Sequence, residues 1–432
     1  MNLENVKNWE TLILNVLSSL RKEEIDEKMA DDSFFEEAFN NLGPLANLPD
    51  LNDEERSRVE FHIRSSISTS FSLEGNILAN TDVERWLDDK RGEIEWNFWN
   101  AYKQYLLKQG RPLALINENS EIIDNILDLS GDPHTEGRWA RKGLVMGNVQ
   151  SGKTQNFIGL LNKAVDVGYK IIIVLGGHQN ELRNQTQARI DEGFIGKLSR
   201  NLIEAGIATG AEPVGVGLEP SRQMDAEVVA FTTTEQDFNT RLANGLNYPL
   251  RNTEMPVVFC VKKIKPILES LKRWIVENNN LAEDGTLEAP LLFIDDESDY
   301  ASINAKKHKE EISAINAEIR SILSKFSKST YVGYSATPFG NVFIDPDEDD
   351  DILAEDLFPK DFMIRIPVPE EYCGQEFFYA NQNDGGDFED ESNVSSPVIV
   401  INDNEDMLPI SKQKKDMEIG SLPKSLEDAI CC

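Results

Sequence analysis

The stretch from residue 147 to residue 154 constrains the fold of this chain more than any other feature of its sequence. It matches the pattern G-x-x-x-x-G-K-[ST] in full, with the residues Gly147, Asn148, Val149, Gln150, Ser151, Gly152, Lys153 and Thr154. An apolar run precedes it, and an amphipathic helical pattern follows it. A strand, a glycine-rich loop and a helix in this order predict backbone N–H groups that surround the β-phosphate of a nucleotide. The competing interpretation is a glycine-rich turn before an ordinary helix.

The side chains of this loop match the chemistry of phosphate and magnesium binding. The Lys153 ammonium would neutralise the β- and γ-phosphates, and the Thr154 hydroxyl would be a ligand of Mg²⁺. We therefore expect ATP and Mg²⁺ as cofactors, with Lys153 as a catalytic residue. The expected cofactor-binding residues are Gly147, Gln150, Ser151, Gly152, Lys153 and Thr154.

Short apolar runs alternate with helical patterns from Gly143 onward. The runs span 143–146, 171–175, 257–261, 291–295 and 330–334, and the helical patterns span 153–167, 264–277 and 310–326. This alternation predicts a parallel sheet with helices on both faces. The predicted fold is α/β, a RecA-like P-loop NTPase lobe over residues 134–345, preceded by a helical N-terminal domain over residues 1–133.

The apolar run that begins at Leu291 ends in carboxylates at Asp295, Asp296, Glu297 and Asp299. A strand that ends in this way places its carboxylates at the carboxyl edge of the sheet, beside the phosphate loop. We assign Asp296 to the metal and Glu297 to the attacking water, as catalytic residues. Asp295 and Asp296 both remain candidates for the metal.

A third strand end carries Tyr334, Ser335, Ala336, Thr337, Pro338 and Phe339. Small hydroxyl side chains at this position can bond the acidic strand end and relay the state of the nucleotide to other parts of the molecule. We therefore expect Ser335 and Thr337 to be coupling residues.

These three segments, in this order, resemble motifs I, II and III of superfamily 2 helicases and translocases. Further segments resemble the Z-one domain family, whose description names an endonuclease. They are 143–154, 174–178, 182–189, 261–263 and 336–344. The resemblance implies a helicase-like ATPase of bacterial anti-phage defence that acts on DNA in the full-length protein. It also implies partner defence proteins, namely a nuclease, a methylase or a gyrase-like ATPase.

The same resemblance places Arg183, Gln185 and Arg189 where such ATPases touch a nucleic-acid backbone, since a helix N-terminus with Arg and polar donors can bind phosphates. A solvated helix face is the competing interpretation. Arg138 and Trp139 precede the phosphate loop, and stacking on adenine is a further hypothesis for this pair.

The charge of the chain weighs against simple nucleic-acid binding. It has 43 Lys and Arg against 76 Asp and Glu, a net charge of -33, and such a surface repels phosphates. Two classes of function follow. One is a DNA-stimulated translocase, and the alternative is a nucleotide-dependent assembly switch that binds partner proteins without translocating or cutting.

We find no Asp and Glu-x-Lys arrangement at a strand end, so we expect no endonuclease activity from this chain.

The remaining sequence sets the expected context of this lobe. Residues 346–432 form an acidic extension that we expect to lead into a second half beyond Cys432. A superfamily 2 motor needs a second lobe with an arginine finger, so we expect weak or absent turnover from this chain alone. No apolar run of about eighteen residues and no signal-peptide pattern occurs, so we expect a cytoplasmic protein without membrane contact.

Overall fold

The computed structural model describes most of the region up to residue 367. The described residues are 3–18, 28, 34–46, 48–52, 55–60, 63, 77–147, 152–199, 212–222, 227–246, 248–251, 253–299, 314–337, 349–350, 354–355 and 357–367. The chain divides into two compact units, Met1–Pro367 and Val368–Cys432. All described residues lie in the first unit, so most of the predicted acidic extension lies outside them.

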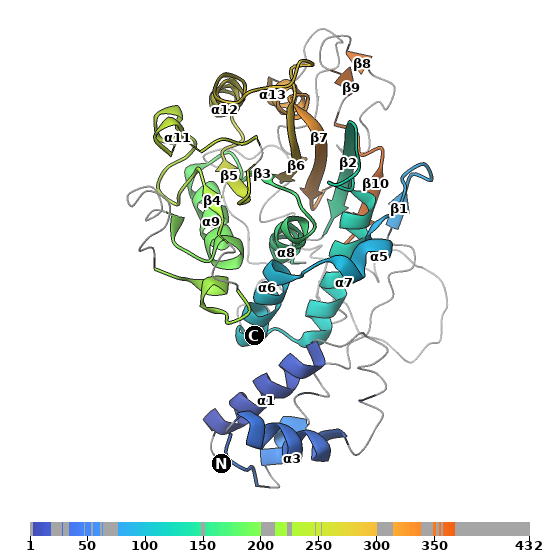
Figure 1. The fold of residues 1–432 in the computed structure, drawn as a ribbon, viewed down its shortest axis with the longest axis vertical. Helices are drawn as coiled ribbons and strands as arrows, with labels where there is room; N and C mark the ends of the chain where they lie inside the picture. Colours follow the sequence, from blue (N-terminus) through green and yellow to red (C-terminus); the bar gives the residue numbers. More distant parts are fainter. Residues whose placement is uncertain are drawn as a thin grey trace, which may run out of the picture. The chain divides into compact units, whose positions relative to one another are not determined.

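The centre of the first unit is a sheet of eight strands, all parallel except for its first member (Figure 1). In spatial order the strands are β1 (Ile77–Ala79), β10 (Phe362–Arg365), β2 (Trp139–Met146), β7 (Phe326–Ser335), β6 (Leu287–Asp296), β3 (Ile171–Leu175), β5 (Val257–Val261) and β4 (Val229–Ala230). A separate antiparallel pair joins β8 (Asp349–Asp350) to β9 (Ala354–Glu355). The molecule is therefore α/β with a mostly parallel sheet.

Each central strand is apolar on both faces, which requires helices on both sides. In β3, Ile172 and Val174 face one hydrophobic core, and Ile171 and Ile173 face the other. The helices and helical turns of the first core are α6 (Asn97–Lys108), α7 (Leu113–Leu129), α8 (Lys153–Asp166), α9 (Asn180–Ile190), η2 (Asp191–Ile195) and η3 (Gly215–Leu218). Those of the second core are α11 (Thr240–Leu246), α12 (Lys265–Asn278) and α13 (Ala314–Leu323).

The N-terminal helices share the first of these cores. The remaining elements are α1 (Leu3–Ser18), α3 (Phe34–Ala46), α5 (Leu87–Lys90) and η1 (Arg91–Glu93). In α1, Trp9, Ile13 and Leu17 recur at helical spacing and are buried. The Trp9 indole packs edge-on against Phe39 at 5.3 Å, and its N–H donates to the Pro49 carbonyl at 2.9 Å. The N-terminal helices and one face of the sheet thus belong to one continuous core.

The five strands expected from apolar runs are all present in the sheet. The sheet also takes in β1 and β10, which lie outside the predicted lobe of residues 134–345. In the part of the chain that the structure covers, no helix has the length and apolar character needed to cross a membrane.

Candidate functional site

The strands that carry the three motifs are neighbours in the sheet. β7 lies between β2 and β6, and all three run parallel. Met146 at the end of β2 is in register with Ser335, and Asp296 at the end of β6 is in register with Tyr334. The Gly147 N–H donates to the Ser335 carbonyl at 3.0 Å, and the Ser298 N–H donates to the Tyr334 carbonyl at 2.9 Å. The three predicted motifs therefore meet at one edge of the sheet.

The predicted phosphate loop, residues 147–154, is described at its two ends only. Gly147 follows β2, and Gly152 precedes α8, while Gln150 and Ser151 lie outside the described residues. Gly152 has a φ of 84°, in the left-handed region, which glycine adopts without the steric cost that a side chain brings. This residue allows the chain to turn directly into the first residue of α8, which is Lys153.

Lys153 lies next to the acidic strand end. Its ammonium donates to the Gly147 carbonyl at 2.6 Å. Burial lowers the pKa of Lys153, and nearby carboxylates oppose that shift. Those carboxylates belong to Asp296, Asp299 and Glu297. The fold thus brings the predicted lysine of the first motif close to the predicted carboxylates of the second, although more than 130 residues separate them in the sequence.

The two adjacent aspartates of β6 face opposite sides of the sheet. Asp295 is fully buried, and its carboxylate pairs with the Lys263 ammonium at 2.6 Å and accepts from the Tyr331 hydroxyl at 2.7 Å. Asp296 is turned toward the side of Lys153. Burial, and next the charge of Glu297, raise the pKa of Asp296 to about 6. Of the two candidates for the metal, only Asp296 keeps its carboxylate on the side of the phosphate loop.

Lys263 organises this strand end, a role that the motifs did not predict. Its side chain is 1% exposed, and besides pairing with Asp295 it donates to the carbonyls of Asp296 and Glu297 at 2.8 Å each. Glu297 has a φ of 55°, the only positive value at a non-glycine residue among those described. This conformation is costly for a glutamate, and the lysine bonds hold the backbone in it. The only hint of Lys263 in the sequence was that residues 261–263 belong to the segments that resemble the Z-one domain family.

The hydroxyl residues of the third motif contact the second. The Thr337 hydroxyl donates to the Asp299 carboxylate, and the Thr337 N–H donates to the buried Ser335 hydroxyl at 2.9 Å. Gly333 lies under Ser298, and a Cβ there would come within 2.8 Å of the serine oxygen. The expected contact between small hydroxyl side chains and the acidic strand end is therefore present.

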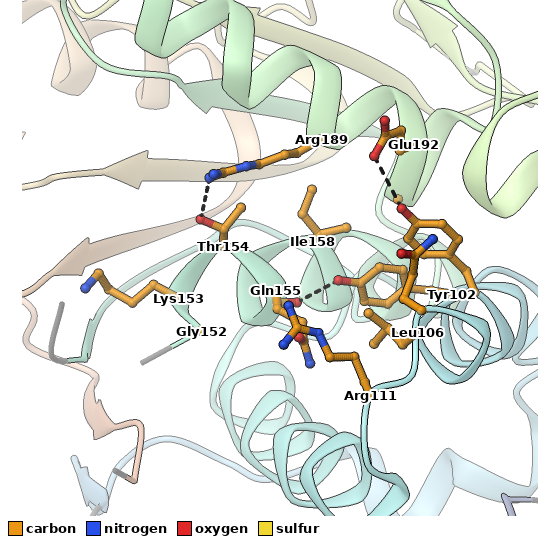
Figure 2. A pocket seen from close by; sticks show the side chains of 13 residues that line it. Tyr102, Leu106, Arg111, Gly152, Lys153, Thr154, Gln155, Ile158, Arg189 and Glu192 are labelled. Carbon is orange, nitrogen blue, oxygen red and sulfur yellow. Dashed lines mark hydrogen bonds between the residues drawn. The ribbon is translucent and has the colours of Figure 1, made fainter. Parts of the chain in front are cut away.

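A cavity of about 540 Å³ adjoins the first turn of α8 (Figure 2). Its lining joins that turn to α6, to the residues after α6, and to the end of α9. Figure 2 shows three hydrogen bonds across it: Arg189 to the Thr154 hydroxyl at 3.1 Å, Tyr105 to Glu192 at 3.3 Å, and Tyr102 to the Gln155 carbonyl at 3.2 Å. The cavity is continuous with Lys153 and Thr154, so it forms part of the same site.

Tyr105, Gln109 and Arg111 also line this cavity, although none of them was predicted as a site residue. They belong to the region predicted as a separate helical domain, and no local motif marks them. Figure 2 shows the Arg111 side chain directed toward Gln155, at the start of α8. Helix α6 brings them to the site because it packs directly on α8.

The structure corrects the prediction for Arg183 as a nucleic-acid contact. Its side chain is 1% exposed and donates to the carbonyls of Thr233 at 2.6 Å and Cys260 at 3.3 Å. The reason is the face of α9 on which it lies. The buried side of that helix consists of Arg183, Thr186, Gln187 and Ile190. Gln185 and Arg189 are on the exposed side, where Arg189 donates to the Thr154 hydroxyl at 3.1 Å.

The hypothesis that Arg138 and Trp139 stack on adenine is also wrong. Trp139 is the first residue of β2, and the phosphate loop follows its last residue, so the pair lies at the opposite edge of the sheet. The Trp139 ring packs edge-on against Tyr169 at 6.1 Å, and Arg138 pairs with Asp284 at 2.8 Å.

The donor set at this edge suits Mg²⁺, since a hydroxyl and carboxylates are the oxygen ligands that it prefers. Thr154 and Asp296 supply them. Within the described ranges, no three His, Cys, Asp or Glu side chains form a group that could hold a metal by itself.

Neither the protein-family models nor the curated proteins with which the sequence was compared contain a match. The resemblance to the Z-one domain family and to superfamily 2 motors therefore stays a prediction from the motifs.

Proposed function

We propose that this chain binds and hydrolyses ATP with Mg²⁺, as the helicase-like motor lobe of a bacterial anti-phage defence or restriction-like protein that acts on DNA. The observation that carries the ATPase proposal is the position of Lys153. It begins the helix after a glycine-rich loop and lies near three carboxylates at the end of β6. The DNA and defence parts of the proposal rest on the family resemblance alone.

The residues divide the chemistry among them. Lys153 would bind the β- and γ-phosphates as a point charge, and Thr154 would supply a hydroxyl ligand to the metal. Asp296 would hold a water ligand of that metal. Glu297 is exposed and would orient the attacking water and accept its proton. When bound, Mg²⁺ would neutralise charge that develops on the phosphates.

The placement of the two aspartates favours Asp296 over Asp295 as the metal-side residue. The Asp295 carboxylate already pairs with Lys263 and accepts from Tyr331 on the far face of the sheet. Using it for magnesium would leave the buried Lys263 ammonium without its partner, which is costly.

We further infer that the nucleoside end of ATP lies in the cavity beside α8. The cavity begins at Thr154 and Gln155, where the phosphate chain would enter, and its size is in the range of small-ligand pockets. Arg111 and Arg189 add positive charge to the lining of this cavity, and Tyr105 supplies an aromatic ring beside the proposed nucleoside position. In this arrangement the N-terminal helices form one wall of the nucleotide site.

The role of Glu297 gives the experiment for hydrolysis. We expect Glu297→Gln to retain ATP binding and to lower single-turnover hydrolysis of radiolabelled ATP by about 10²-fold to 10⁴-fold, the usual contribution of a general base. The matched control is Glu283→Gln, which makes the same change at an exposed residue between α12 and β6. Equal hydrolysis by the two variants would contradict the assignment.

A nucleotide-dependent assembly switch is the second candidate, and two observations favour it. The chain carries a net charge of -33, and Arg183 is buried, which removes one of three expected contacts to nucleic acid. ATPase stimulation by double-stranded DNA separates the two functions. A translocase predicts stimulation that weakens as salt is raised, whereas a switch predicts a rate that DNA does not change.

A further inference from the structure

A second cavity, of about 470 Å³, lies at the opposite edge of the sheet from the phosphate loop. Its walls are formed by the first residues of β2 and β7, the last turn of α13, and Leu357. Lys142, the last lining residue on β2, lies five residues before Gly147, which is about 16 Å along the strand. The second cavity is thus a site apart from the nucleotide site.

Arg320 is the residue of this cavity that is buried with guanidinium nitrogens unpaired among the described residues. It lies on α13, its side chain is 4% exposed, and it lines the cavity. Neither Nε nor Nη2 of its guanidinium has a hydrogen-bond partner within the described part of the chain. A buried guanidinium without a counter-charge is strongly unfavourable, so this position calls for an acceptor from outside.

The other cations at the cavity differ from Arg320 in having carboxylates nearby. Arg138 pairs with Asp284 at 2.8 Å, and an Arg141 nitrogen lies 4.0 Å from the Asp361 carboxylate. Lys142 also lines the cavity. No carboxylate lines it among the residues that the structure describes. In a chain with a net charge of -33, such a concentration of basic side chains points to an anion.

The rest of the lining is apolar or carries hydroxyl groups. Leu323, Phe326 and Leu357 supply the apolar surface, and Ser327 and Ser329 supply hydroxyls. A small-ligand site typically combines an apolar lining with a few polar groups that orient the ligand. An inorganic ion would leave the apolar walls unused, and a nucleic acid is too large for a cavity of this volume.

We propose that this cavity binds a small organic anion, with its phosphate or carboxylate group on Arg320 and its apolar body against Leu323, Phe326 and Leu357. A carboxylate or phosphate can accept the two parallel hydrogen bonds that a guanidinium offers. The cavity also adjoins the start of β7, and the end of that strand carries Ser335 at the nucleotide edge. The ligand therefore contacts an element that is shared with the nucleotide site.

The experiment uses the whole chain in a Lys153→Ala background, so that phosphate compounds do not bind at the phosphate loop. The probes are phenyl phosphate and benzoate, with benzamide as the neutral analogue and sodium chloride to match ionic strength. We expect one of the two anions to bind saturably in a calorimetric titration and to raise the Tm by about 2 °C at ten times its Kd. Benzamide should do neither.

Arg320→Met, added to that background, tests the residue. It should weaken the affinity for the bound anion at least tenfold, and it should raise the Tm in the absence of anions, because it removes an unpaired buried charge. The control is Arg273→Met, which removes the same charge from an exposed position on α12 and should change neither quantity. The proposal is wrong if neither anion binds, or if Arg320→Met lowers the Tm, since the chain itself would then supply the counter-charge.

Discussion

Asp295 and Asp296 are neighbours in the sequence but have different roles, because successive side chains of a strand point to opposite faces. The buried ion pair between Asp295 and Lys263 lies under the strand end. Lys263 also donates to the carbonyls of the next two residues and so holds Glu297 in its unfavourable backbone conformation. The position of the proposed catalytic glutamate thus depends on a lysine that lies outside the three motifs.

The Lys263 pair gives a stability prediction. We expect Lys263→Met to lower the free energy of unfolding by about 3 to 5 kcal/mol, because it leaves Asp295 buried and unpaired. Urea denaturation followed by circular dichroism measures the effect. Lys262→Met is the control, since its ammonium is 3.9 Å from Asp237 and more exposed. The double change Lys263→Met with Asp295→Asn should recover part of the loss. Equal stability of the two single variants would contradict this account.

Arg111 gives a binding prediction for the cavity beside α8. We expect Arg111→Ala to weaken ATP binding about tenfold, or about 1.4 kcal/mol, and to change the binding of inorganic triphosphate by much less, because the residue contacts the nucleoside end. Calorimetric titration with both ligands measures the ratio. Arg241→Ala, an exposed change on α11, is the control. An equal loss for ATP and triphosphate would place Arg111 at the phosphates instead.

At the scale of elements, α8 connects the nucleotide edge to the N-terminal helices. Its last residue, Asp166, accepts from the N–H groups of Phe98 and Trp99 at 2.9 and 2.8 Å. N–H groups in the first turn of a helix have no acceptor within that helix. The Asp166 carboxylate therefore caps α6 from a distant part of the chain. Burial raises the pKa of Asp166 to about 7, although these two bonds act against it.

The raised pKa of Asp166 predicts a pH dependence of stability. The folded state binds the proton more tightly than the unfolded state does, so the contribution to stability is complete below about pH 4 and is lost as the pH rises to about 7. We expect a loss on the order of 2 to 4 kcal/mol over this window. Asp166→Asn should flatten the pH profile of urea denaturation, and Asp89→Asn on the exposed surface should leave it unchanged. A profile that Asp166→Asn does not alter would refute this assignment.

The sequence predicted the elements of this fold better than the contacts between them. Apolar runs identified five strands because each run is buried on both faces. Strands β1, β4 and β10 escaped notice because two to four residues carry too little periodicity. The order of the strands was not predictable in detail, yet the strand ends with glycine, carboxylates and hydroxyls were expected at one edge, and they are there.

The parts of the site that the sequence missed depend on long-range packing. Tyr105 contacts Glu192 across 87 residues of chain, and Arg111 reaches the cavity only because α6 lies on α8. Arg183 was misread because a helix N-terminus with an arginine looks the same in sequence whether that arginine faces solvent or the sheet. The rotation of α9 about its axis decides between these alternatives.

At the scale of the whole molecule, the net negative charge and the local clusters of basic side chains have opposite effects on the binding of phosphates. The surface as a whole repels phosphates, while basic side chains gather at two cavities on opposite edges of the sheet. Helices from the N-terminal region complete the first cavity, so the proposed nucleotide site is built by distant segments of the chain that share one hydrophobic core. The proposed ATP site therefore belongs to the first unit as a whole rather than to the phosphate loop alone.

A titration of the purified chain with fluorescently labelled ATP and Mg²⁺ tests the central proposal most directly. We predict saturable binding by the wild-type chain that unlabelled ATP displaces. Binding should be lost in Lys153→Ala and kept in Lys325→Ala, which removes a lysine from the turn between α13 and β7. Absence of saturable binding by the wild type, or equal binding by Lys153→Ala, would contradict the account.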